Sequence, residues 1–497
     1  MGLYKIISGS SHGQRDTEHF IECLQELPEQ WTEFFAGDRE LIVTRAPGRI
    51  DLMGGIGDYS GSLVLSLPIA NATHVAFQKV PNRRIRIVSL PSEPAMPPRI
   101  FEISSDKLFV NGSPITYAES RKIFAARLGD HWAAYIVGAF IVLLHGGHLT
   151  YDCGANILIR SSVPEGKGVS SSAALEAALM QALISAYQIE ISPAKAALLC
   201  QKVENLVAGA PCGVMDQMAA FCGKADHLVE LLCQPAELKG LVALPEALAV
   251  WAIDSGVRHS IRGASYGTVR TAAFMGYRII ADCAGLNVRA SSARGHVEIE
   301  DHLWNGYLAN VTPEEFETSF AARIPEWMLG QSFLDRYQGI TDGLTSIDPL
   351  IEYPIKRATE HPIYENHRVK QFVAILKNWQ SLDQAKQLGE LMCQAHQSYS
   401  ECGLGSDATD RLVELAAAYF GDGIFGAKIS GGGNGGTVAI LGRRDADELI
   451  EEIAASYREE TARTAPIISG SSSGTASFGF LTLMPESSAT RATEGTR

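Results

Sequence analysis

The sequence lacks the cysteine patterns that indicate disulfides or a zinc site. Its nine cysteines are scattered over 497 residues, no two are spaced as C-x-x-C, and their number is odd. Disulfide-stapled domains carry paired cysteines, and zinc sites commonly carry C-x-x-C ligand pairs. We therefore expect a protein of a reducing compartment, and the cytoplasm is its expected location.

Long apolar runs are also missing. The most apolar stretch, Trp132 to Leu144, contains Gly138 and is shorter than the roughly 20 residues that a membrane-spanning helix needs. Charged residues such as Lys5 and Asp16 interrupt the N-terminal segment, which therefore does not resemble a signal peptide. The sequence predicts no membrane partner, and residues 132–144 are expected to form a buried helix.

An excess of positive charge is absent as well. The net charge is −14 and the pI is about 5.5, and such a surface repels nucleic acid and anionic membranes. The hydrophobic content of 46% and the charged content of 20% are those of an ordinary globular protein, and the length fits two or three domains. A few local basic groups can still bind an anionic substrate. No pattern in the sequence indicates an oligomeric state.

The most informative stretch that is present is a turn rich in glycine and serine, Val163 to Ala174. An apolar run that predicts a strand, Asn156 to Ile159, precedes it, and an Ala/Leu run that predicts a helix, Ala173 to Tyr187, follows it. A turn of this kind directs backbone N–H groups and a helix N-terminus at one point, which is how proteins hold phosphate. The turn matches neither the Walker A pattern nor G-x-G-x-x-G. Our hypothesis from these residues is a nucleotide-phosphate loop in a small-molecule kinase.

A second glycine-rich segment lies between two predicted strands, Leu41 to Val43 and Ser62 to Ile69. It carries Arg49 and Asp58 on a connection with three glycines in four residues, Gly54 to Gly57. Such backbone either turns tightly or lets a ligand approach closely. The segment alone leaves two interpretations open: a surface hairpin with an Arg49–Asp58 salt bridge, or a binding loop.

Three further features each allow a structural and a functional interpretation. Asp216 lies at the start of a predicted helix, where a carboxylate is commonly a cap or a dipole partner. Trp132 and Tyr135 lie at helical spacing, which fits core packing as well as a shelf for a nucleobase. Residues 430–436 contain five glycines between two apolar strands, which indicates a close approach to a ligand or to another chain segment.

The expected organisation has two main parts with a boundary near residue 245. We expect an N-terminal helical arm at 1–40, an N-terminal domain at 41–245, a C-terminal domain at 246–484 with an insertion near 290–360, and a disordered tail at 485–497.

Taken in order, three segments resemble the GHMP kinase superfamily, and its galactokinase branch in particular. They are Pro47-Gly48-Arg49 with Asp58-Tyr59, the glycine/serine turn, and the glycine-rich loop near Gly432. The resemblance covers roughly residues 40 to 485. It implies an α+β fold of two domains with the active site in the cleft between them.

The resemblance also implies a role for each matching residue, with ATP as phosphoryl donor, Mg²⁺ as cofactor and a monosaccharide as acceptor. The implied roles are catalysis by Asp216 and Arg49; sugar binding by Asp58, Gly55, Ile56, Gly213 and Tyr266; nucleotide binding by Trp132, Tyr135, Gly166, Gly168, Ser170, Ser171, Ser172 and Ala173; and metal binding by Ser172 and Glu204. In this scheme Asp216 accepts the proton of the sugar hydroxyl, and Arg49 keeps Asp216 ionised.

One departure from the family concerns the sugar. Galactokinases usually read Gly-Glu-His-Thr-Asp-Tyr where this chain reads Gly-Gly-Ile-Gly-Asp-Tyr at 54–59, and the missing Glu and His lie near the 6-hydroxymethyl group of galactose in that family. L-Arabinopyranose has the ring stereochemistry of galactopyranose without that group. Residues 51–61, 209–217 and 402–407 also resemble the kinase part of plant L-arabinokinases. We therefore expect phosphorylation of L-arabinose at the anomeric hydroxyl, giving β-L-arabinose 1-phosphate.

Three alternatives remain open at this point. Galactose is one, because vacating space for one small group changes selectivity only about 10- to 200-fold. Glucuronate is another, although Gly55 and Ile56 supply no basic group for its carboxylate. The third is a sugar-sensing regulator without kinase activity. Such relatives lose residues just after the serine run, whereas Ser172, Ala173 and Ala174 are intact here.

Overall fold

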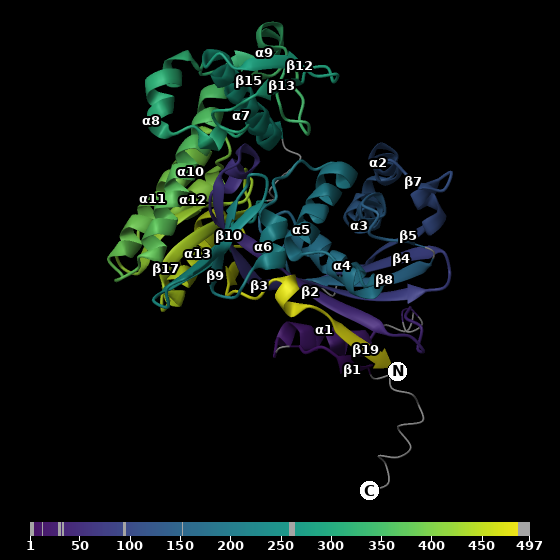
Figure 1. Ribbon diagram of the computed structural model, residues 1–497. Coiled ribbons are helices and arrows are strands. Elements are labelled where there is room, and N and C mark those ends of the chain that lie inside the picture. Colours follow the sequence, from purple (N-terminus) through teal and green to yellow (C-terminus); the bar gives the residue numbers. More distant parts are fainter. Residues whose placement is uncertain are drawn as a thin grey trace.

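The structure is a computed structural model, and it describes residues 4–11, 13–27, 31, 34–92, 96–151, 153–257 and 264–485. The larger of its two principal sheets takes all its strands but β19 from the first half of the chain, and the smaller sheet takes its strands from residues 248–469. A third group of short elements lies apart from both sheets (Figure 1).

The larger sheet has nine strands and is centred on β3. Its main path runs β1-β19-β2-β3-β8-β4-β5, and β9 and β10 continue from the first part of β3. Residues 73–80 of β3 pair with β8, whereas residues 63–66 pair with β9. The strands are β1 (Tyr4–Ser8), β2 (Leu41–Met53), β3 (Leu63–Val80), β4 (Arg84–Leu90), β5 (Arg99–Ser104), β8 (Gly154–Ser161), β9 (His227–Leu232), β10 (Glu237–Ala243) and β19 (Leu481–Pro485).

Alternating side chains of this sheet pack into two different cores. Val75 and Phe77 face a core that includes the helices after β5, whereas Ala76 between them faces the N-terminal segment with Phe20 and Phe34. The sheet is therefore covered on both faces. The associated elements are α1 (Arg15–Gln25), α2 (Tyr117–Ala125), α3 (Ala134–His145), α4 (Ser171–Tyr187), α5 (Pro193–Lys202), α6 (Met215–Cys222), α14 (Thr475–Phe478) and the short hairpin β6 (Phe109–Val110) with β7 (Ser113–Pro114).

The second sheet has four strands in the order β16-β17-β11-β18, all antiparallel. A shared core joins it to β2 and β3 through α10 and α11. No helix in the described part of the chain combines the length and the apolarity needed to cross a bilayer. The elements are β11 (Leu248–Asp254), α10 (Ile355–Lys377), α11 (Gln384–Glu401), α12 (Asp407–Ala417), β16 (Ile424–Ser430), β17 (Thr437–Arg443), α13 (Asp447–Thr461) and β18 (Ile467–Ser469).

The chain between α7 (Ala264–Cys283) and α10 forms the separate group of short elements at the top of Figure 1. It packs on α7 and on the first half of α10 through its own hydrophobic core. Part of the predicted insertion at 290–360 is thus the start of α10, which continues through Pro362. The short elements are β12 (Asn287–Ala290), β13 (Val297–Glu300), α8 (Pro313–Glu315), β14 (Met328–Leu329), α9 (Gly330–Tyr337) and β15 (Glu352–Tyr353).

Two predicted boundaries differ from the structure because strand pairing joins the ends of the chain. The segment 1–40 is not only a helical arm, since Tyr4–Ser8 is a strand that pairs with β19. Strand β19 also pairs with β2, so the last strand of the predicted C-terminal domain belongs to the first sheet. The expected tail covers residues 485–497. Pro485 is the last residue of β19, and residues 486–497 lie outside the described residues.

Strand β2 is much longer than predicted, because it continues from Leu41 through the glycine-rich segment to Met53. Its pairing with β3 shifts between Pro47 and Arg49 and again between Asp51 and Met53. A register shift tolerates Pro47, which has no N–H for the ladder, and re-aims the neighbouring side chains. Arg49 and Asp51 are two residues apart on this strand and both are buried.

A buried ion pair connects the two sheets. Lys428 of β16 reaches Asp51 of β2 with 3.2 Å between Nζ and Oδ2, and both side chains are 0% exposed. Asp51 also receives the backbone N–H of Gly431 at 3.3 Å, and its own N–H donates to Ser430 Oγ at 2.9 Å. The end of β16 is therefore held against the glycine-rich end of β2.

This ion pair predicts a large effect of Lys428→Met on stability. Removing the ammonium leaves the Asp51 carboxylate buried without its cation, and breaking one partner of such a pair destabilises by about 3–5 kcal/mol. We expect a loss of that size in urea denaturation, and partial recovery in Asp51→Asn/Lys428→Met. The matched control is Lys377→Met, because Lys377 is 54% exposed in its ion pair with Glu230, where we expect about 1 kcal/mol or less. Equal losses in the two lysine variants would contradict this account.

Candidate active site

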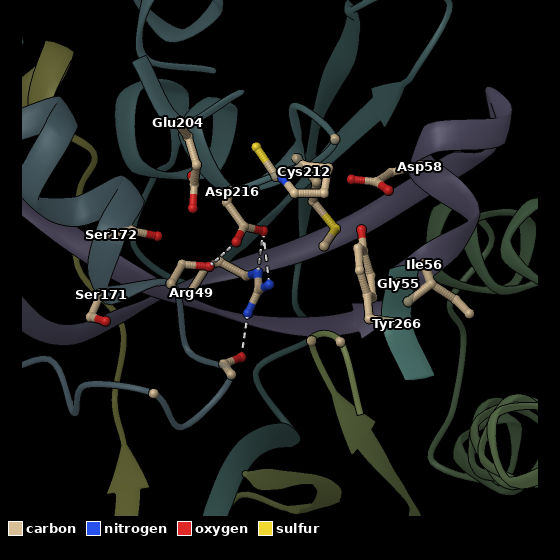
Figure 2. Close-up of a pocket in the computed structure, with 18 residues that line it drawn as sticks. Arg49, Gly55, Ile56, Asp58, Ser171, Ser172, Glu204, Cys212, Asp216 and Tyr266 are labelled. Atoms are coloured by element: carbon tan, nitrogen blue, oxygen red, sulfur yellow. Dashed lines mark hydrogen bonds and ion pairs between the residues drawn. The ribbon is translucent and has the colours of Figure 1, made fainter. Parts of the chain in front are cut away.

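One pocket is lined by Arg49 of the first sheet, by helix ends and turns, and by the loop that follows β16 of the second sheet (Figure 2). It collects the segments that the sequence singled out, although they lie far apart along the chain. The lining residues are Arg49, Gly55, Ile56, Asp58, Gly166, Gly168, Ser170, Ser171, Ser172, Glu204, Pro211, Cys212, Gly213, Met215, Asp216, Tyr266, Gly431 and Gly432.

An ion pair between Arg49 and Asp216 forms part of this pocket (Figure 2). The Arg49 Nε–H donates to Asp216 Oδ1 at 2.9 Å, and a terminal guanidinium nitrogen lies 2.8 Å from the same oxygen. Another guanidinium N–H of Arg49 donates to the Gly168 carbonyl at 2.6 Å. Arg49 is nearly fully buried, whereas the Asp216 side chain is 27% exposed. Arg49 therefore pairs with Asp216 and not, as the hairpin interpretation supposed, with Asp58.

Asp216 lies in the first turn of α6, where both its oxygens have partners. The Ser170 hydroxyl donates to Oδ2 at 2.5 Å, while Arg49 holds Oδ1. A carboxylate has about four lone-pair sites, so Asp216 can still accept a hydrogen bond from a ligand. Its position combines both interpretations from the sequence: a carboxylate at a helix start that also faces the pocket.

The glycine/serine turn ends at Ser170, which has a left-handed conformation with φ of 63°. Helix α4 begins at Ser171, and no side chain caps it among the described residues. At this end of the helix the Ala174 N–H donates to the Ser170 carbonyl. The N–H groups of Ser171, Ser172 and Ala173 precede it and, with the helix dipole, form an anion-binding end. Ala173 itself is fully buried and lines neither pocket.

A second pocket adjoins the first and shares three of its residues, Gly166, Ser171 and Ser172. Trp132 and Tyr135 line this second pocket while also packing against the core of the first sheet. The position of these aromatics is thus compatible with core packing and with a shelf for a nucleobase. The N-terminus of α4 lies between the two pockets and contributes to each.

The loop after β16 packs directly on the glycine/serine turn. A Cβ added at Gly168 would lie 2.8 Å from the Ser430 carbonyl, and one at Gly431 would lie 2.7 Å from the Gly168 carbonyl. Lys167, from the same turn, reaches Asp254 with 2.9 Å between Nζ and Oδ2. Backbone contact at this distance requires glycine on both sides, which explains Gly168 and Gly431.

The other end of the pocket is formed by the 3₁₀ turn Gly55–Ser60, together with Gly213 and Tyr266. Burial, and secondly the charge of Asp216, raises the pKa of Asp58 from its ordinary 3.8 to about 7. A Cβ at Gly213 would lie 1.7 Å from Asp58 Oδ2, so position 213 has no room for a side chain. Burial also raises the pKa of the Tyr266 phenol.

Ser172 and Glu204 line the pocket together and supply two hard oxygen groups. Glu204 lies in a π-helical turn, Val203–Ala208, of the kind often found at functional sites. Burial and the charge of Asp216 raise its pKa to about 7, while hydrogen bonds from Ser172, Cys212 and Gln217 act in the opposite direction. A cation would favour the ionised form, so these residues fit a divalent metal. Within the described residues no group of three or more His, Cys, Asp or Glu is arranged for a metal.

Several residues of the site escaped the sequence analysis. A buried group lies behind Gly55, the residue at which the 3₁₀ turn of the pocket begins. It consists of Asp51, Lys428 and Tyr399. Two signals were available: Asp51 is two residues from Arg49, and Lys428 is the single charge within an apolar strand. Cys212 lines the pocket and had no such signal.

Three family models match this chain. The GHMP kinases N terminal domain matches residues 134–224, the galactokinase galactose-binding signature matches residues 29–79, and the GHMP kinases C terminal model matches residues 375–459. The first contains the glycine/serine turn and Asp216, and the second contains Arg49 and Asp58.

Known proteins agree with these matches. L-Arabinokinase of Arabidopsis thaliana is 41% identical over 537 aligned residues, covering 96% of this chain; the chain spans 52% of that protein's length. Galactokinase of Roseiflexus sp. (strain RS-1) is 27% identical, with 89% of this chain and 94% of that protein covered. The crystal structure of Lactococcus lactis galactokinase complexed with galactose shares the fold, with a TM-score of 0.69, 20% identity and coverage of 91% and 98%. The matched models, the fold and these sequences all show that the chain is similar to the GHMP kinase family.

Proposed function

We propose that this protein is an ATP-dependent sugar kinase that phosphorylates the anomeric hydroxyl of L-arabinose, giving β-L-arabinose 1-phosphate. The observation that carries the proposal is the position of the Arg49–Asp216 pair. It lies in a pocket that has the uncapped N-terminus of α4 on one side and the turn with Asp58 on the other. Phosphoryl transfer needs such an arrangement of donor and acceptor more than it needs covalent help.

The second pocket supports ATP as the donor. A nucleobase beside Trp132 and Tyr135 would place its phosphates at Ser171 and Ser172, which line both pockets. The free N–H groups of the first turn of α4 would then hold phosphate oxygens.

Asp216 is suited to receive the proton of the attacking hydroxyl. A carboxylate is a weak base for a sugar hydroxyl, so the proton moves late, as the bond to phosphorus forms. Arg49, which is hydrogen-bonded to Asp216 Oδ1, holds the carboxylate in place and stabilises negative charge beside it.

Mg²⁺ is the proposed cofactor, and when bound it neutralises charge on the phosphates and orients them. The residues that would hold it are Ser172 and Glu204, and its other ligands would be phosphate and water oxygens. Gln217 donates to Glu204 Oε2 at 2.8 Å and so fixes the carboxylate.

The apolar wall at Gly55 and Ile56 supports L-arabinose as the acceptor. Both residues line the pocket, yet Gly55 has no side chain and Ile56 offers only hydrocarbon. A sugar with a hydroxymethyl group would find no side-chain hydrogen-bonding partner at this wall, and a pentopyranose needs none. The name of the Arabidopsis relative, L-arabinokinase, points to the same sugar.

Asp216→Asn should remove most of the turnover. The amide keeps the shape of the carboxylate but is not a base, so kcat should fall about 100- to 10,000-fold with little change in KM for ATP. ADP release in a coupled assay measures this. Asp447→Asn is the matched control, because Asp447 accepts the Trp251 indole N–H outside the pocket. Full activity of Asp216→Asn would rule out Asp216 as the proton acceptor.

L-Arabinose should have a larger kcat/KM than galactose. One small group at an apolar wall changes selectivity by about 10- to 200-fold, so galactose should remain a slow substrate. A panel of pentoses and hexoses, with the anomeric phosphate detected by phosphorus NMR, measures both rate and position. Preference for galactose would reassign the chain as a galactokinase, and absence of any phosphorylation would refute the kinase proposal.

Asp58→Asn should stabilise the protein, and more so at high pH. In the folded state the pKa of Asp58 is about 7, above its ordinary 3.8. Its contribution to stability is thus full below about pH 4 and is lost as the pH rises through about 7. We expect the rise in melting temperature to be larger at about pH 8 than at about pH 5. Asp335→Asn, on the exposed surface of α9, is the control that should change little at either pH. An equal effect of Asp58→Asn at both pH values would contradict the raised pKa.

A further inference from the structure

The wall of the pocket at Gly55 and Ile56 rests on Tyr399 of α11, a side chain that does not line the pocket itself. Tyr399 is fully buried, and its hydroxyl accepts the backbone N–H of Ile56 at 2.9 Å. A Cβ added at Gly55 would lie 1.5 Å from the same hydroxyl oxygen. The phenol therefore occupies the space that any side chain at position 55 would need.

Tyr399 is held in place from several sides. Its hydroxyl lies 3.4 Å from Asp51 Oδ2, and Lys428 Nζ lies 5.2 Å from the centre of its ring. The His361 ring packs edge-on at 5.1 Å between centroids. Asp51 Oδ1 in turn accepts the Gly55 N–H at 3.1 Å. The two wall residues are thus held by neighbouring buried side chains: the Gly55 N–H by Asp51 and the Ile56 N–H by Tyr399.

The backbone at the wall depends on these bonds. Gly55 has a positive φ of 38°, which a residue with a side chain adopts less readily. Among the described residues the buried N–H of Ile56 has no other acceptor, and leaving such a group unpaired is unfavourable. The same 3₁₀ turn continues to Asp58, so a shift at its start moves the acceptor end of the pocket as a whole.

We infer that Tyr399 is a positioning residue that sets the place of the Gly55–Ile56 wall and thereby the choice of sugar. The inference rests on the proposed kinase function. Tyr399 acts through backbone atoms, and the pairing of Gly55 with Tyr399 keeps the wall apolar and close to the acceptor. A sugar without a substituent at the wall fits, and one with a hydroxymethyl group is disfavoured.

Tyr399→Phe tests this inference, because it removes only the oxygen that accepts the Ile56 N–H. The ratio of kcat/KM for L-arabinose to that for galactose should fall about tenfold, while KM for ATP stays unchanged. Tyr457→Phe is the matched control. Tyr457 is also fully buried, and its hydroxyl donates to the Ser255 carbonyl at 2.8 Å, away from the wall.

A double-mutant cycle with Gly55→Ala adds a second measurement. Gly55→Ala places a methyl group against the phenol oxygen and should impair sugar use. In Gly55→Ala/Tyr399→Phe that overlap is relieved in part, because the nearest remaining ring atom would be 2.7 Å away. The two changes should therefore be less harmful together than their separate effects predict.

Hydrogen exchange of the peptide covering residues 54–61 is the readout that does not need activity. It should become faster in Tyr399→Phe than in Tyr457→Phe. If Tyr399→Phe keeps the wild-type sugar ratio and exchange rate, Tyr399 is only a packing residue and the inference fails. If the wild type phosphorylates neither sugar, the proposed function fails and this inference with it.

Discussion

The contact between Asp51 and Lys428 is the constraint on which the site depends. It joins a strand of each sheet where neither charge reaches water. Two buried charges are tolerable only when they remain together and hydrogen-bonded. The end of β2 must therefore stay beside the end of β16. Gly431 reaches the pocket through this contact, and Gly55 is bound to the other oxygen of the same carboxylate.

The contact between β2 and β16 also positions the polar groups of the pocket. Arg49 is two residues before Asp51, on a stretch of β2 whose pairing shifts on either side, and it is directed to Asp216 and the Gly168 carbonyl. Gly168 belongs to the glycine/serine turn, which leads into the N-terminus of α4. Two neighbouring pockets share this N-terminus. A donor phosphate on one side and an acceptor hydroxyl on the other would meet beside Asp216. The bonds of Ser170 and Arg49 to its two oxygens fix the direction from which a hydroxyl can approach it.

Hydrophobic pattern predicted many elements but not their partners. The strand predicted at Asn156–Ile159 lies within β8, and the helix predicted at Ala173–Tyr187 ends with α4 at Tyr187. Pairing between distant segments leaves no such local trace. For that reason the return of β19 to the first sheet was missed, as was the extension of β2 past Pro47. The motifs indicated which residues share a site, whereas the bond from Ser170 to Asp216 depends on a left-handed backbone that no local pattern announces.

The charges in the pocket are not balanced by the chain itself. Arg49 is the one Lys or Arg among the described residues that line it. Burial raises the pKa of Asp58, Glu204 and the adjacent Glu176, and neighbouring carboxylates add to each effect. A fold optimised for stability alone would not bury three such groups, because each prefers to be neutral there. A cation and the hydroxyl donors of a sugar would supply further partners to Glu204 and Asp58, the two of these groups that line the pocket. Part of the stability given up in burying them would then return as binding free energy, concentrated where phosphoryl transfer would require it.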